Sequence, residues 1–423
     1  MRRVVHITRR VTMTAPPAKA TKPLKVLLLN QTFYPDVVAT AQYLTDLALQ
    51  LKERGHEVTV ITGRRAYEES EKQFAAREEW RGIHIRRVWA SSFGKLAKWR
   101  RAADFATFIL SCCWRLLWLP RQDVTVALTS PPLISWIAAW FTRLRGGRFC
   151  YWVMDMNPDE AVAAGWLREG SLVARGLESF SRFSLRTAAR IVVLDRFMLE
   201  RVLRKGISAE KISVTSPWSQ DEKIRFDAAG REAFRREHGF GERFVVMHAG
   251  NHSPCHPLDT LLDAATLLRD SGDILFCFQG GGSELAKVRQ RVDEQKLPNV
   301  VCLPYQPVER LSAALSAADL HVVVMGNPFV GTIHPCKIYN ALAVGAPILY
   351  LGPERSHAAD ILNGACVPSS HISVRHGEAQ QLAERVRALS QSRPRLTESE
   401  RIRTAAMCSR ATLLPRMVAA IEG

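Results

Sequence analysis

The sequence predicts an α/β protein made of two doubly wound domains, each with a mostly parallel sheet. Its 423 residues exceed the length that one hydrophobic core ordinarily serves. Short apolar runs alternate with segments of helical period, which is the βαβ pattern. The alternation restarts after a polar stretch near residues 218–242. We therefore assign residues 25–218 to a first domain and 219–400 to a second.

Composition narrows the classes of partner. The chain is 47% hydrophobic and 23% charged, which is ordinary for a globular protein, but its formal net charge is +17. Such a charge favours phosphorylated substrates, anionic membrane surfaces or polyanions. We expect no nucleic acid, because no recognised nucleic-acid module or aromatic stacking platform is present. The nine cysteines form no C-x-x-C pair, so we expect reduced thiols in a cytosolic protein.

The first βαβ unit follows a basic, Pro-, Ala- and Thr-rich arm at residues 1–24, which lacks the apolar core of a secretory signal. A buried strand is predicted from Lys25 to Asn30, and a helix from about Ala41 to Arg54. A second strand follows it. No G-x-G-x-x-G occurs between the first strand and the helix, which disfavours a classical dinucleotide site.

Residues 95–120 combine a basic start with aromatic and aliphatic side chains, among them Trp114 and Trp118. This mixture suits the headgroup boundary of an anionic bilayer. The alternative is a helix packed on the sheet with its arginines exposed. The segment does not span a membrane, because Arg115 interrupts its apolar part, which is shorter than the ~20 residues a bilayer needs.

Residues 124–142 carry no charge, yet Pro131-Pro132 divides them into a strand pattern and a helix pattern, so we predict strand–turn–helix. The next strand ends at Asp155, where a carboxylate could bind substrate hydroxyls or act as a base. We assign Asp159 and Glu160 to the N-terminus of the following helix. Farther along, Asp195 is predicted to cap a helix.

The second half of the chain repeats the alternation of predicted strands and helices. One strand ends in Gly250-Asn251, and Gly280–Gly282 mark either a tight turn or a close approach of backbone to a ligand. The stretch HPCKIYNALAVGAPILYLG begins with a loop and continues as a helix that starts near Lys337. A lysine at a helix N-terminus favours phosphate, and the alternative is an ordinary loop–helix–strand unit with a solvated lysine. Residues 401–423 are predicted to be a helix that crosses back to the first domain.

The chain resembles glycosyltransferase family 4. The segments KVLLLN, YPDVVATAQYLTDLALQLKERGHEVTVITG, YWVMDMNPDEAVAAGWL, SPWSQDEK, HAGN and HPCKIYNALAVGAPILYLG carry the likeness, in this order. It covers nearly everything from about Lys25 onward. The nearest likeness is to the subgroup that builds bacterial O-antigen and exopolysaccharide on polyprenyl lipids.

The resemblance implies a GT-B fold, in which two Rossmann-like domains face a cleft. It also implies a retaining transfer from a nucleotide-sugar to a lipid-linked saccharide acceptor, with no metal cofactor. By position, Lys337 would neutralise the donor diphosphate and Asp155 would face the sugar. Other donor-side candidates are Gly250, Asn251, His252, His256, Gly280, Gly281, Thr332, His334 and Asn340. Acceptor or membrane candidates are Tyr34, Thr40, Trp114 and Trp118.

This sequence departs from the family pattern at two places. Thr332 and Asn340 occupy the positions of a pair of glutamates, and His252 and His256 stand where the family often has a basic pair. A neutral imidazole supplies less charge than lysine. We therefore expect a glycosyltransferase on the cytoplasmic face of the plasma membrane, bound peripherally to anionic lipid. The alternative is a GT-B-shaped protein that binds nucleotide-sugar or partner enzymes without turnover.

Overall fold

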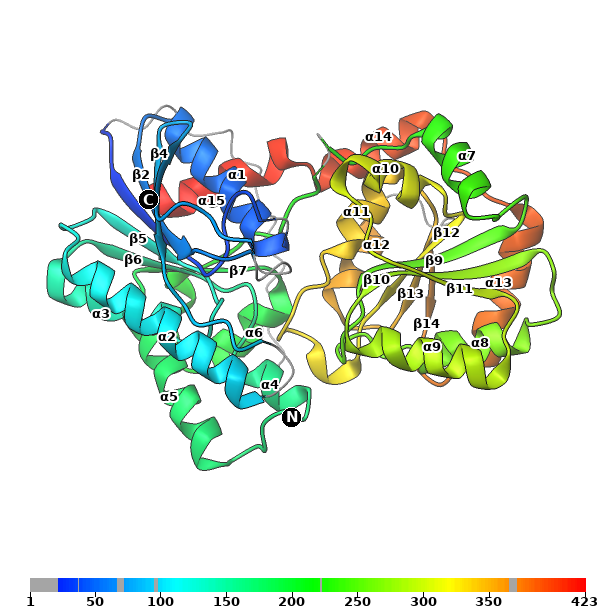
Figure 1. The fold of residues 1–423 in the computed structure, drawn as a ribbon, viewed down its shortest axis with the longest axis horizontal. Helices are drawn as coiled ribbons and strands as arrows, with labels where there is room; N and C mark the ends of the chain where they lie inside the picture. Colours follow the sequence, from blue (N-terminus) through cyan, green and yellow to red (C-terminus); the bar gives the residue numbers. More distant parts are fainter. Residues whose placement is uncertain (1–21, 37, 67–71, 95–97, 221–222, 365–370) are drawn as a thin grey trace, which may run out of the picture.

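The computed structural model describes residues 22–36, 38–66, 72–94, 98–220, 223–364 and 371–423, and it folds into two α/β domains side by side (Figure 1). The N-terminal sheet has eight strands in the order β3-β4-β2-β1-β5-β6-β7-β8, and the C-terminal sheet has six in the order β11-β10-β9-β12-β13-β14. Both contain the crossovers that a doubly wound sheet requires. The predicted GT-B class, two Rossmann-like domains, is therefore confirmed. Most of the predicted N-terminal arm, and Lys95, lie outside the described residues.

The N-terminal domain carries helices on both faces of its sheet (Figure 1). Its strands are β1 (Lys25–Leu29), β2 (Glu57–Gly63), β3 (Arg77–Trp80), β4 (Ile83–Val88), β5 (Val124–Ala127), β6 (Arg148–Trp152), β7 (Arg190–Val193) and β8 (Ile212–Val214). Its helices are α1 (Ala39–Glu53), α2 (Lys98–Leu117), α3 (Ile134–Arg145), α4 (Asp159–Ala163), α5 (Leu172–Thr187) and α6 (Arg196–Arg204). The uncharged segment 124–142 forms β5 and the start of α3, as predicted.

The edge strand β3 is antiparallel to β4, whereas every other pair in this sheet is parallel. Arg81 and Gly82 connect the two strands, and both have positive φ angles, 51° and 75°. Two consecutive left-handed residues are what a tight hairpin turn needs. The sequence analysis did not predict this strand.

The C-terminal domain repeats the architecture with a fully parallel sheet. Its strands are β9 (Phe244–Asn251), β10 (Ile274–Gly281), β11 (Val300–Leu303), β12 (Leu320–Val324), β13 (Ile348–Leu351) and β14 (His371–Val374). Its helices are α7 (Ala228–Glu237), α8 (Asp259–Leu267), α9 (Ser283–Gln295), α10 (Val308–Ser316), α11 (Lys337–Val344), α12 (His357–Gly364), α13 (Ala379–Ser392) and α14 (Glu398–Met407).

The last helix, α15 (Arg410–Glu422), returns to the N-terminal domain, where it lies beside α1 (Figure 1). Its apolar face belongs to the N-terminal core and comprises Leu413, Leu414, Met417, Val418 and Ile421. Near its end, the carboxylate of Glu422 accepts hydrogen bonds from Arg54 and from His56 at 2.9 Å. The chain therefore passes between the domains twice.

Helix α2 has two different faces. Phe108, Cys112 and Leu116 follow one another at intervals of four residues and pack into the N-terminal core. Trp114 and Trp118, 65% and 69% exposed, lie on the opposite side. Among the described residues, no helix is both long and apolar enough to cross a bilayer.

Candidate active site

The candidate active site lies where the strand ends of the two domains meet. The loop after β6 contacts the loop before α11, because the N–H of Met156 donates to the carbonyl of Thr332 at 2.7 Å. The pKa of the Cys255 thiol is raised to about 11, first by burial, and it also responds to the charges of Glu160, Lys337 and Asp155. Groups from both domains therefore act on one small region.

Lys337 is the first residue of α11, as the sequence predicts. Its Nζ donates to the carbonyl of Asn251 at 2.7 Å and lies 2.9 Å from Nε2 of His248. The lysine side chain runs along Gly250, where a Cβ would meet Lys337 Cε at 3.4 Å. Gly250 also has a φ of 114°, so glycine suits this position for two reasons. Lys337, Gly250 and Asn251 are thus brought together.

His248 is a residue that the sequence analysis missed. It is fully buried in β9, and its Nδ1 lies 3.0 Å from the carbonyl of Val322. A carbonyl only accepts, so Nδ1 carries the proton and Nε2 is free to accept from Lys337. Its position inside an apolar strand pattern, FVVMHAGN, gave no hint of this role.

Near neutral pH, both the charged and the neutral form of Lys337 are populated. Burial lowers the pKa of Lys337 to about 7. An anionic ligand beside the ammonium would favour its charged form again. The positive charge at this helix start therefore develops fully only when an anion is present.

The histidines of the HSPCHP loop are neutral. Burial, followed by the charge of Lys337, lowers the pKa of His252 to about 4 and that of His256 well below its usual value. His252 Nδ1 lies 3.3 Å from the carbonyl of Gly281, and its Nε2 is buried without a hydrogen-bond partner among the described residues. His256 Nδ1 lies 2.7 Å from the carbonyl of Val324. Both lie near Lys337, but neither adds positive charge.

The triple glycine is explained by contacts inside the protein. A Cβ on Gly280 would lie 2.1 Å from the carbonyl oxygen of Gly250, and one on Gly282 would lie 2.3 Å from that of His252. A Cβ on Gly281 would meet the ring of Tyr305 at 2.7 Å. These residues let β9 and β10 approach each other where Lys337 is held.

Two carboxylates on the N-terminal side influence each other. Burial raises the pKa of Asp155 to about 6, and burial together with Asp155 raises that of Glu160 to about 8. Asp159, in contrast, accepts from Lys205 at 2.8 Å and lies 3.8 Å from Arg201. Asp159 lies in the first turn of α4, as predicted, but both of these partners come from α6 and its C-terminal end. Glu160 lies in the first turn of α4, as predicted, but it also acts on Asp155.

Thr332 and Asn340, which stand at the positions of the family's glutamates, differ in burial. Thr332 is buried, and its hydroxyl donates to the carbonyl of Phe329 at 2.9 Å. Asn340 is partly buried, one turn after Lys337 on α11. His334 does not lie beside Lys337, because its two ring nitrogens contact Asp195 at 2.9 Å and the hydroxyl of Tyr339 at 2.6 Å.

The acceptor candidates lie on the N-terminal domain. Tyr34 stacks on Trp80 with ring centroids 4.0 Å apart, and Thr40 shares a 3.2 Å hydrogen bond with Thr32. Beside the exposed face of α2 there is an open hollow of about 480 Å³, mostly apolar, lined by Val88, Trp89, Leu110, Ser111, Trp114 and Arg115. It is separate from the surroundings of Lys337.

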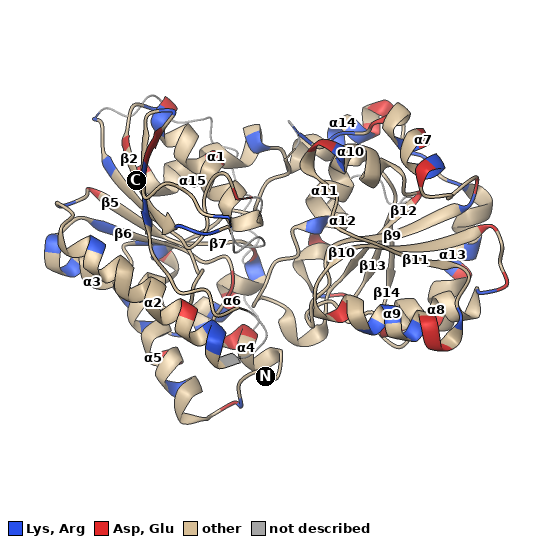
Figure 2. Ribbon diagram, viewed as in Figure 1, with Lys and Arg blue, Asp and Glu red and all other residues tan. Residues whose placement is uncertain are grey.

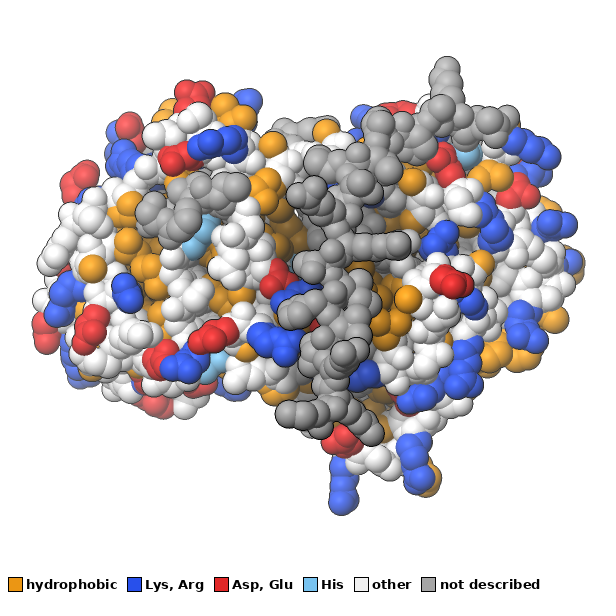
Figure 3. Space-filling model, turned by 180° about the vertical axis from the view of Figure 1, so that it is seen from behind, with side chains coloured by type: hydrophobic (Ala, Val, Ile, Leu, Met, Phe, Trp, Pro, Cys, Tyr) orange, Lys and Arg blue, Asp and Glu red, His pale blue; other side chains and the backbone are white. Residues whose placement is uncertain are grey.

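Basic side chains are numerous on this domain. Figure 2 shows Lys and Arg along α2, α3 and α5, and from behind they gather at the lower end of the same domain, on the right in that view (Figure 3). Arg168, Arg175 and Arg186 are among the exposed basic side chains of this domain.

Comparisons with known proteins agree with this geometry. The sequence profile of a glycosyl transferase 4-like domain matches residues 39–218. One relative is WcaI of Escherichia coli, which is named as a putative colanic acid biosynthesis glycosyl transferase. It is 24% identical over 337 residues, which cover 76% of this chain and 82% of WcaI. A Pseudomonas aeruginosa protein named as a glycosyltransferase, WbjE, is 24% identical over 260 residues, 60% of this chain and 64% of its own length.

Solved structures support the fold. WaaG, a glycosyltransferase involved in lipopolysaccharide biosynthesis, superposes with a TM-score of 0.68 at 17% identity, covering 94% of this chain and 99% of that one. Anabaena Alr3699/HepE in complex with UDP-glucose gives a TM-score of 0.68 at 14% identity, over 94% and 98% of the two chains. Residues 39–218 are therefore similar to a glycosyl transferase 4-like domain, and the chain as a whole shares the two-domain GT-B fold of these glycosyltransferase structures.

Proposed function

We propose that the protein is a retaining glycosyltransferase of bacterial surface polysaccharide synthesis, which moves a sugar from a nucleotide-sugar to a lipid-linked saccharide. The observation that carries the donor side is the position of Lys337, at a helix start, against Gly250 and Asn251. The HepE structures in complex with UDP and with UDP-glucose support a nucleotide-sugar donor. The names of WcaI and WaaG support cell-envelope polysaccharide as the product class.

The proposed role of Lys337 is electrostatic. When the sugar leaves, negative charge grows on the departing nucleoside diphosphate. An ammonium already held at the helix N-terminus stabilises that charge without reorganisation. Because the protein itself supplies this positive charge, we propose that the transfer requires no metal at the diphosphate.

Asp155 and Glu160 supply the polar groups on the other side. Because the pKa of Asp155 is about 6 and that of Glu160 about 8, one proton is shared between them near neutral pH. We propose that Asp155 binds hydroxyls of the transferred sugar and that Glu160 sets its protonation. This pair gives the site carboxylates that the positions of Thr332 and Asn340 lack.

The lipid end of the acceptor would be handled by the N-terminal domain. We propose that Trp114 and Trp118 enter the headgroup region of an anionic membrane while exposed arginines of α2 and α5 contact its phosphates. The apolar hollow beside α2 lies on the same surface. This places the protein peripherally on the cytoplasmic face of the membrane.

The test is nucleotide release from a panel of UDP-, GDP- and dTDP-sugars with a polyprenyl-pyrophosphate saccharide as acceptor. NMR of the product gives the anomeric configuration. We expect one donor to be consumed and Lys337→Ala to lower turnover more than about tenfold. Lys287→Ala is the matched control, because this lysine is exposed on α9 and pairs with Glu284 on the same helix. Equal turnover in both variants would remove Lys337 from the mechanism.

The second candidate, binding without turnover, is favoured by the uncharged Thr332 and Asn340. A protein of that kind would show a melting temperature raised by one nucleotide-sugar, since ligand binding stabilises the folded state. It would release no nucleotide with any acceptor.

A further inference from the structure

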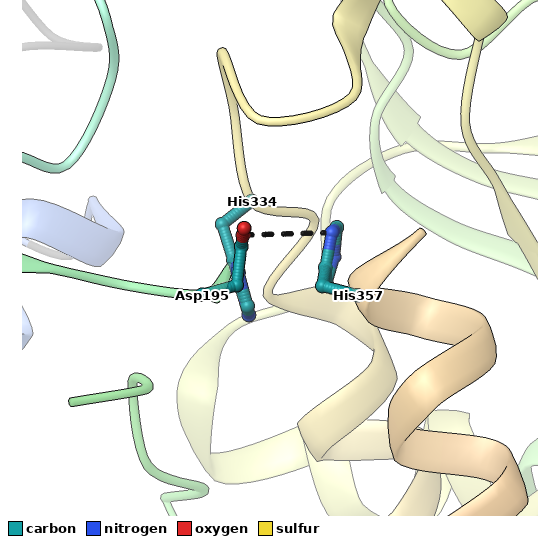
Figure 4. A group of neighbouring side chains, drawn as sticks. All are labelled: Asp195, His334 and His357. Carbon is teal, nitrogen blue, oxygen red and sulfur yellow. Dashed lines mark hydrogen bonds and ion pairs between the residues drawn. The ribbon is translucent and has the colours of Figure 1, made fainter. Parts of the chain in front are cut away.

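A buried cluster of Asp195, His334 and His357 lies at the junction of the two domains. Asp195 follows β7 of the N-terminal domain, His334 precedes α11, and His357 begins α12 (Figure 4). The three residues are 6%, 7% and 2% exposed. Two imidazoles and a carboxylate are therefore withdrawn from water at a point where the domains touch.

The donor atoms of this cluster converge. Oδ2 of Asp195 lies 2.9 Å from Nδ1 of His334 and 3.7 Å from Nδ1 of His357. One ligand atom from each residue falls within 4.8 Å of the others. In a tetrahedral site with metal–ligand bonds of about 2.0–2.1 Å, ligand atoms lie roughly 3.3 Å apart. The two distances to Asp195 fall on either side of that separation.

His357 lacks hydrogen bonds within the described part of the chain. Neither of its ring nitrogens has a partner at hydrogen-bond distance, although both are buried. Leaving a buried polar group unpaired costs about 1–3 kcal/mol. A neutral imidazole carries its proton on one nitrogen and a lone pair on the other, so this unpartnered ring can offer a nitrogen to a metal ion.

The other two ligands are fixed through their remaining polar atoms. Oδ1 of Asp195 accepts from the N–H groups of Phe197 and Met198 at 2.9 and 2.8 Å, which leaves Oδ2 for the cluster. Nε2 of His334 lies 2.6 Å from the hydroxyl of Tyr339, which leaves Nδ1 facing Asp195. Partners of this kind orient imidazoles and carboxylates at metal sites.

We propose that Asp195, His334 and His357 bind one divalent transition-metal ion of the Zn²⁺ class, which ties the N-terminal domain to the C-terminal domain. Two imidazole nitrogens and one carboxylate oxygen are ligands that Zn²⁺ accepts, whereas Mg²⁺ and Ca²⁺ favour oxygen ligands throughout. The ion is structural. It is distinct from the donor diphosphate, which Lys337 serves.

The guanidinium of Arg196 does not occupy the position proposed for the metal ion. Arg196, the residue after Asp195, directs its guanidinium to Asp360 of α12, with Nη2 2.9 Å from Oδ1. That pair also crosses between the domains. Asp360 thereby neutralises the charge of Arg196, the basic residue that follows the proposed ligand Asp195 in the sequence.

The experiment uses the full chain, purified and stripped with a chelator, then titrated with Zn²⁺ and with Co²⁺. We expect one ion per chain, a visible Co²⁺ d–d spectrum of a four- or five-coordinate site, and a higher melting temperature with Zn²⁺. Affinity should fall at least about tenfold in His357→Ala and in Asp195→Asn. Asparagine caps a helix as well as aspartate does, so Asp195→Asn tests the ligand with the helix cap retained.

The control is His84→Ala, which removes a half-exposed histidine of β4 far from the cluster in sequence. Retention of the ion by His84→Ala and its loss from the cluster variants would support the proposal. Failure of the stripped chain to bind Zn²⁺, or equal binding by all variants, would overturn it. If His357→Ala does not fold, the Co²⁺ spectrum of the unaltered chain and the Asp195→Asn titration still decide.

Discussion

Lys337 illustrates how a single side chain is adjusted by what surrounds it. Its ammonium donates to one carbonyl and one neutral imidazole, and no carboxylate in the described part of the chain forms an ion pair with it. Burial therefore lowers its pKa to about 7. In a free site of this kind, the charge that binds an anion is lost when the pH rises through neutrality.

The first prediction follows from that pKa. The affinity for a nucleotide-sugar should be roughly tenfold lower at pH 8 than at pH 6, because the free site then has to take up a proton to bind. A nucleotide-sugar is the suitable probe, since its diphosphate has no terminal phosphate to titrate in this range. His252, with a pKa of about 4, does not change its charge there. Calorimetry at both values checks this. Lys337→Ala should lose the part of the difference that the lysine contributes and keep only the part due to Asp155 and Glu160, whose pKa values are about 6 and 8.

Glu160 gives a prediction about stability. Its pKa in the folded state is about 8, raised from 4.5, so the folded protein holds this proton more tightly than the unfolded chain. Its contribution to stability is present below about pH 4.5 and is lost as the pH rises toward 8. Glu160→Gln keeps the shape and removes the titration. The variant should therefore gain melting temperature relative to the parent at pH 8 and little at pH 5. An equal difference at both would contradict the assigned pKa.

At the residue scale, prediction from sequence worked for positions defined by local backbone rules. Asp195 caps α6 through the N–H groups of Phe197 and Met198, as predicted, and Lys337 begins α11, also as predicted. His248 was missed because its partner, Lys337, lies far along the chain. The influence of Asp155 on Glu160 was missed because it depends on the burial of both carboxylates, which local sequence does not show. The placement of His334 against Asp195 depends on how two domains meet, which local sequence does not encode.

At the scale of elements, α2 shows how one helix serves two environments. The sequence analysis weighed a membrane-facing helix against a core helix, and the structure contains features of both. Phe108, Cys112 and Leu116 bury one side, while Trp114 and Trp118 expose the other. Periodicity therefore identified the helix, but only packing shows which side is left over.

The prediction for α2 concerns membrane binding. The chain should bind vesicles containing anionic lipid in a salt-sensitive way, and Trp114→Ala with Trp118→Ala should weaken this binding. Trp166→Ala is a matched control, since Trp166 is 49% exposed on the same domain but lies after α4. Co-sedimentation with vesicles measures the binding of the parent chain, the double variant and the control. Equal binding to neutral and anionic vesicles would rule out the electrostatic contribution.

Many of the strands and helices could be predicted from hydrophobic periodicity and from turn residues such as Gly and Pro. The strand β3 was missed, because its polar sequence, REEW, lacks the apolar run of a buried parallel strand. An edge strand is half-solvated and follows different rules. The helices α5 and α7 were not predicted either.

At the scale of the whole molecule, the domains are joined by more than their linker. The helix α15 supplies a face of the N-terminal core, and ion pairs from Glu422 to Arg54 and His56 fix its end. The sequence predicted a helix that crosses back, and α15 does lie on the N-terminal domain. Its partners could not be predicted, since they come from the opposite end of the chain.

This arrangement predicts unequal effects within one helix. Met417→Ala should lower the free energy of unfolding by about 2–5 kcal/mol, because a fully buried side chain is removed from the N-terminal core. Arg416→Ala, on the exposed side of the same helix, should change it by less than about 0.5 kcal/mol. Denaturant titration distinguishes them. Similar losses in both variants would mean that α15 does not pack as described.

The return of α15 also has a consequence for protein synthesis. The eight-stranded domain emerges from the ribosome first, but the helix that closes its core is translated only after residues 219–409. At 5–20 residues per second, this delay lasts roughly 10 to 40 s. Throughout that time the newly made half exposes the apolar core residues that α15 later covers. A nascent chain of this design depends on chaperones, or on slow folding of its first half, until its last helix arrives.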